Sequence, residues 1–163
     1  MLLLTELAGC RTLREGSSEL RLSFVTDSSH VTVYDRGNAY VGNIAYTLTN
    51  TTNQPISRSG CGGPGYPDLE KKVSNRWVVA YDNISLACRT HPDFSWDPGS
   101  QIRDVLRFTA FKPGHNTYPQ IRVDSIDGTY RLRWSFTEGR QEGAKGARSI
   151  EAVSNEFLIT SSS

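Results

Sequence analysis

Three side chains in the middle of the sequence could take part in three kinds of chemistry. Cys88 and His91 have the C-x-x-H spacing of zinc ligands, and Cys61 could supply a third donor. A structural zinc site normally has four donors, and the sequence offers no convincing fourth one. Cys61 and Cys88 could instead form a disulfide. Cys61 could also act as a nucleophile with His91 as its base, but a disulfide would consume that thiol.

The first ten residues bear on this choice. Leu2, Leu3 and Leu4 are followed by Leu7-Ala8-Gly9-Cys10, which resembles the lipobox of bacterial lipoproteins, where a cysteine after small residues is lipidated and becomes the mature N-terminus. The resemblance covers only this segment, and it lacks a basic residue before the leucines. An ordinary apolar strand with an incidental Cys10 is the alternative.

The lipobox resemblance also accounts for the odd number of cysteines. If Cys10 carries a lipid, Cys61 and Cys88 remain as a pair, so we expect a disulfide and no metal site. The chain would then lie outside the cytoplasm, in the cell envelope, in the periplasm or on the outer surface. No apolar run is long enough to span a membrane, and any attachment would therefore be through the lipid at Cys10.

Other classes of function receive little support from the sequence. Eighteen basic and 17 acidic side chains leave a formal charge of +1, which gives no field to attract nucleic acid. No nucleophile elbow, zinc-protease motif or phosphate-binding loop is present. We therefore expect a protein that is not an enzyme and that needs no cofactor.

The elements that must position these residues are β-strands, because apolar residues alternate with polar ones throughout and no helical stripe is sustained. We predict one domain at residues 19–160, after a signal remnant and linker at 1–18 and before a disordered tail at 161–163. The expected strands are residues 19–26, 30–35, 41–50, 69–73, 75–81, 86–89, 102–111, 129–136 and 150–160.

Two aromatic residues carry the resemblance to a fold. Gly128-Thr129-Tyr130 at the start of a late strand resembles the tyrosine corner of immunoglobulin-like domains, in which the tyrosine hydroxyl bonds back to the backbone. The resemblance implies that Trp77 is the core tryptophan of an earlier strand and that Tyr130 is the corner residue. No cysteine stands two residues after Tyr130, where antibody domains have one.

The wider pattern is similar to the immunoglobulin-like domains of exported bacterial lipoproteins, and distantly to the intracellular proteinase inhibitor domains. Both imply an all-β fold, an antiparallel immunoglobulin-like β-sandwich. We expect a monomeric, non-catalytic module of the cell envelope, with a binding or structural role, that contacts a protein or a cell-wall glycan through loops 60–67 and 112–120. Tyr66, His115 and Tyr118 are the candidate loop contacts. The alternatives are a protease inhibitor-like domain and a metal-binding protein that uses Cys61, Cys88 and His91.

Overall fold

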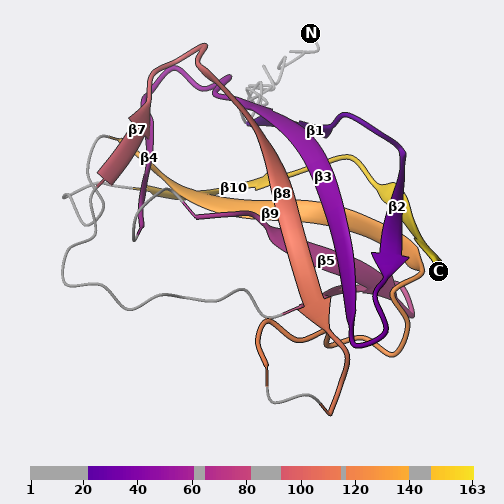
Figure 1. The fold of residues 1–163 in the computed structure, drawn as a ribbon. Helices are drawn as coiled ribbons and strands as arrows, with labels where there is room; N and C mark the ends of the chain where they lie inside the picture. The colour runs from indigo at the N-terminus through magenta and orange to yellow at the C-terminus, as the bar shows by residue number, and fades with distance from the viewer. Residues whose placement is uncertain (1–21, 61–64, 82–92, 115–116, 140–147) are drawn as a thin grey trace, which may run out of the picture.

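A computed structural model describes residues 22–60, 65–81, 93–114, 117–139 and 148–163. These residues form strands and no helix (Figure 1). The strands are β1 (Ser23–Thr26), β2 (His30–Asp35), β3 (Ala39–Thr49), β4 (Ile56–Ser59), β5 (Asp68–Val73), β6 (Arg76–Val79), β7 (Asp93–Trp96), β8 (Gln101–Phe111), β9 (Gly128–Glu138), β10 (Arg148–Val153) and β11 (Phe157–Ser162). The prediction of an all-β fold is confirmed.

The strands belong to one mixed sheet that does not close on itself. Its main path runs β1-β3-β2-β11-β9-β4-β7, while β8 pairs with β3, β10 and β5 pair with β9, and β6 pairs with β5. All pairs are antiparallel except that of β11 with β2. In Figure 1, β3 and β8 lie side by side and cross in front of β9 and β10.

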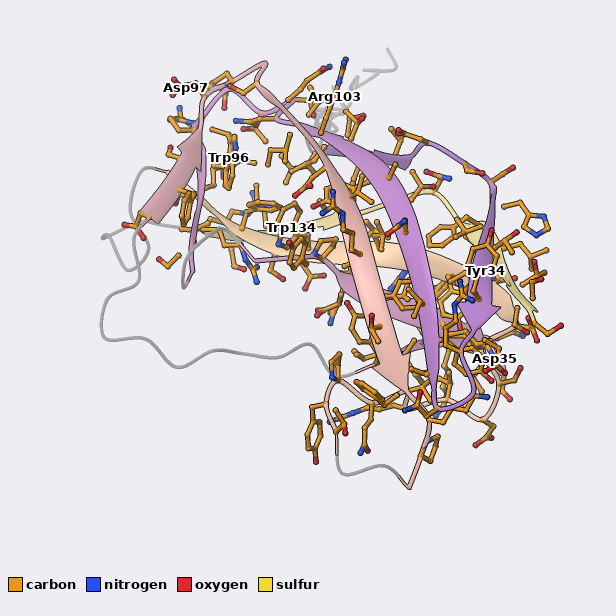
Figure 2. All side chains as sticks on the ribbon, viewed as in Figure 1. Tyr34, Asp35, Trp96, Asp97, Arg103 and Trp134 are labelled. Atoms are coloured by element: carbon orange, nitrogen blue, oxygen red, sulfur yellow. The ribbon has the colours of Figure 1, made fainter. Side chains whose placement is uncertain are left out.

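The core lies between these two groups of strands. The inward side chains of β9, namely Tyr130, Leu132, Trp134 and Phe136, are at most 2% exposed. The Trp134 ring lies 5.8 Å from Tyr46 of β3 and 6.4 Å from Phe24 of β1 between ring centroids. Aromatic contacts therefore join the front strands to β9. Figure 2 shows Trp134 on the same half of the molecule as Trp96, whose ring contacts Phe136.

The interpretation of Trp77 as the core tryptophan is wrong. Trp77 lies on β6, which pairs only with β5 among the described strands, and its side chain is half-exposed. The fully buried tryptophan is Trp134. The strand predicted at 75–81 is present as β6, but among the described residues no second layer covers the side of β6 that carries Trp77.

The hydrogen bond expected of Tyr130 is present. The Tyr130 hydroxyl donates to the Ile126 carbonyl oxygen at 2.6 Å, and the side chain is fully buried. This bond holds the segment just before β9 against the first residues of that strand. Burial raises the pKa of Tyr130, so the hydroxyl keeps the proton that it donates.

Other differences from the predicted strands concern their ends and their number. The strand predicted at 150–160 is two strands, because Ser154 and Asn155 bond through their side chains to Leu132 and Thr26 and interrupt the ladder. β11 continues to Ser162, which pairs with Tyr34, so 161–162 are strand residues and not a disordered tail. β4 and β7 were not predicted, and the segment 86–89 lies outside the described residues.

Candidate protein-binding site

The hairpin of β5 and β6 carries three of the exposed valines of the described residues, Val73, Val78 and Val79. Two strands of period-two sequence are separated by Ser74 and Asn75, and Val73 pairs with Arg76. Both turn residues have positive φ, at 48° and 63°, as a two-residue type I′ turn requires. The sequence predicted both strands, and a two-residue gap that ends in asparagine is the signal that could have identified the hairpin.

β6 does not follow the usual pattern of one dry and one wet face. Val78 is 38% exposed and Val79 is 36% exposed, although they point to opposite faces, and Val73 at the end of β5 is 42% exposed. Charged residues or proline commonly protect a strand at the edge of a sheet, and here only Arg76 does so. The hairpin therefore presents an apolar surface to solvent on both of its faces.

Two cations, one on the hairpin and one on β9, lie over the ring of Trp77. The Arg131 guanidinium carbon is 4.3 Å from the centroid of the indole ring, and the Lys72 Nζ is 5.4 Å from it. Lys72 also forms an ion pair with Glu156 at 3.2 Å. A cation over an indole face is attracted by the ring quadrupole, so the side chain of Trp77 is held in one place. A fixed aromatic side chain loses little entropy when a partner covers it.

A network of charges fixes Arg131 in turn. The Glu70 carboxylate is 6% exposed and accepts a hydrogen bond from the Arg131 Nε at 2.7 Å. The Arg133 Nε lies 2.9 Å from the other oxygen of Glu70, as an ion pair without the alignment of a hydrogen bond. Arg133 also approaches Glu151 and Asp68. Because each of these charges has a partner, the net charge beside the hairpin is small.

Lys71 anchors the hairpin on the opposite face. Its side chain is almost fully buried, and the Nζ donates to the Ser125 carbonyl oxygen at 2.5 Å. Burial lowers the pKa of Lys71, while Asp127 and Asp124 oppose this effect. Its Cε would lie 2.7 Å from a Cβ at Gly128, where φ is +146°, so only glycine leaves room for the lysine there.

The structure does not bring the predicted loop contacts together. Tyr66 is 47% exposed just before β5, and Tyr118 is 62% exposed beside the end of β8. Within the described ranges, no hydrogen bond, ion pair or ring contact joins either tyrosine to the other or to Trp77. Cys10, Cys61, Cys88, His91 and His115 lie outside the described residues, so their predicted roles stay predictions.

No group of three or more histidine, cysteine, aspartate or glutamate side chains in the part of the chain that the structure describes could hold a metal ion. No helix long and apolar enough to cross a membrane occurs among the same residues.

Comparison of the sequence with protein-family models and with curated proteins found no match.

Proposed function

We propose that this chain is a non-catalytic, immunoglobulin-like protein-binding module of the bacterial cell envelope, and that it binds through the β5–β6 hairpin. The observation that carries the proposal is the setting of Trp77. Arg131 and Lys72 lie over its half-buried ring, and Val73, Val78 and Val79 are exposed on the same hairpin. Tryptophan and arginine are the residues most enriched at the energetic centres of protein interfaces.

The sandwich part of the proposal is supported by strand topology. β1 pairs antiparallel with β3, the chain turns at Asp27-Ser28-Ser29, and β2 then pairs parallel with β11. β1 and β2 together would then act as one strand that begins in one sheet and ends in the other. They would connect a front layer of β1, β3 and β8 to a back layer of β4, β5, β9, β10 and β11. The Tyr130–Ile126 hydrogen bond is the other feature typical of such domains.

The location in the envelope is supported by sequence alone. Leu7-Ala8-Gly9-Cys10 resembles a lipobox, and Cys61 with Cys88 would then make a disulfide suited to an oxidising compartment. The mass of the protein recovered from membranes tests this part. Loss of the residues before Cys10 with an added diacylglycerol group is expected, and an unmodified Met1 in the cytosol would contradict it.

Site-specific photocrosslinking tests the binding site. A photoreactive amino acid replaces Val79 on β6 in one variant and Val25 on β1 in the control, since both valines are exposed. In cells that produce the protein naturally, Val79 should give protein adducts that Val25 does not. The adduct should disappear when Trp77→Ala is added. Equal labelling from both positions, or none from Val79, would contradict the proposed site.

A further inference from the structure

Some backbone N–H and C=O groups of β6 are not used in its pairing with β5. In the type I′ hairpin, Val73 and Arg76 form a hydrogen-bonded pair, so Lys71 and Val78 form the next one. The bond from the Ala80 N–H to the Leu69 carbonyl oxygen, at 2.8 Å, continues this alternation. The N–H and C=O groups of Trp77 and Val79 therefore point away from β5, towards the edge of β6 that no described strand occupies.

This spacing is self-complementary. Trp77 and Val79 are two residues apart, so a second β6 in antiparallel orientation would place Trp77 opposite Val79 of the other copy, and Val79 opposite Trp77. Each of these pairs could exchange both of its N–H···O bonds. Val78 would then face Val78 of the other copy across a two-fold axis, in the non-hydrogen-bonded pair between them. A two-fold interface requires this kind of self-matching surface.

The side chains favour the same arrangement. Trp77 opposite Val79 is an aromatic and β-branched pair, which is among the stabilising cross-strand combinations. The Val78 side chain is 38% exposed in one chain, and in the pair each Val78 would cover the other. Arg76, the one charged residue of β6, would lie opposite Ala80 and away from the axis, so no like charges would face each other directly.

We propose that the partner of the β6 edge is a second copy of this chain, and that two copies join their sheets by antiparallel pairing of β6 about Val78. The inference rests on the proposed function, because it names the partner of the same hairpin. It differs from the sequence-based expectation of a monomer, which took no account of the edge strand.

Sedimentation equilibrium of the purified full chain over a wide range of concentration gives the first test. The protein should associate to a dimer, and Val78→Lys should weaken the association about ten-fold or more by placing two ammonium groups at the axis. The matched control is Val25→Lys, because Val25 on β1 is 45% exposed, somewhat more than Val78. A monomer at all concentrations, or a dimer that Val78→Lys leaves unchanged, would overturn the inference.

Cysteine crosslinking tests the register. In a non-hydrogen-bonded pair the Cα atoms are about 4.5 Å apart and the Cβ atoms are closer than in hydrogen-bonded pairs, which suits a disulfide. Val78→Cys should therefore give a 78–78 crosslink on mild oxidation. Val79→Cys should not crosslink to itself, because Val79 faces Trp77. Val25→Cys and the unmodified chain show the background from the native cysteines. Equal crosslinking of Val78→Cys and Val79→Cys would overturn the predicted register.

The two proposals can fail separately. If photocrosslinking from Val79 captures a different protein, and the purified chain is a monomer, the hairpin is a binding site and the self-pairing inference is wrong. If nothing is captured from Val79 and the chain is a monomer, both are wrong.

Discussion

Strands β6 and β9 have similar chemistry and opposite surroundings. Both strands carry a tryptophan and other large apolar side chains, yet four side chains of β9 are almost completely buried and none of β6 is. β9 has neighbours on both edges and the front strands over its inward face, whereas β6 pairs with β5 alone among the described strands. Alternation decides which residues share a face, and the layers around the strand decide whether that face is dry.

The largest expected difference between the two strands is between their tryptophans. Trp134→Ala should lower the free energy of unfolding by about 3–5 kcal/mol, because it removes a buried ring at the contact between the front strands and β9. Trp77→Ala should cost only about 1 kcal/mol, the contribution of an exposed cation–π contact and some partial burial. Urea unfolding of both variants measures these values. Equal losses would show that the Trp77 ring is covered as completely as the Trp134 ring, by its own chain or by a second copy.

The sequence predicted much of the fold because many strands are covered on one face. The predicted bounds of β2 agree with the structure, and those of β3, β8 and β9 differ by at most two residues. Pro98 and Gly99 are residues typical of a turn, and they form one before β8, with the Ser100 N–H bonded to the Asp97 carbonyl oxygen. In these regions local pattern and tertiary packing agree.

The regions that were missed depend on partners distant in the sequence. β4 and β7 are four residues long and pair with each other across more than thirty residues, so neither shows a local pattern of its own. The break before β11 depends on side-chain bonds from Ser154 and Asn155 to β9 and β1. The candidate site was missed for the same reason, because Arg131 is far from Trp77 in sequence and meets it only through the pairing of β5 with β9.

Tyr81, which is buried just after β6, should make the stability of the protein depend on alkaline pH. Tyr81 follows β6 by two residues and is 4% exposed. Its pKa is raised from 10.0 to about 12, mainly by burial and also by the charges of Asp68 and Tyr66. Above pH 10 the unfolded chain releases the Tyr81 proton and the folded chain retains it. Stability should therefore fall between pH 10 and pH 12, by about 2–3 kcal/mol for this residue.

Urea unfolding at pH 9 and at pH 11.5 measures this effect. Tyr81→Phe keeps the ring and removes the ionisable group, so the variant should lose less stability than the natural chain over the same interval. Tyr118→Phe is the control, because that side chain is 62% exposed. If Tyr81→Phe and Tyr118→Phe show the same pH dependence as the natural chain, Tyr81 is not protected from ionisation by burial.

The smallest expected effect is at the turn of the hairpin. Ser74 has a φ of 48°, a left-handed conformation that costs most residues about 1–2 kcal/mol and glycine nothing. Ser74→Gly also makes the unfolded chain more flexible, which opposes folding by about 0.5–1 kcal/mol. The net result should be a gain of about 0.5 kcal/mol, seen as a higher urea midpoint with an unchanged m-value. Ser149→Gly on β10 meets only the opposing effect and should lower the midpoint. If both variants lose stability equally, the β5–β6 turn does not hold Ser74 in the left-handed region. The type I′ turn, from which we infer that the backbone groups of Trp77 and Val79 point away from β5, would then be wrong.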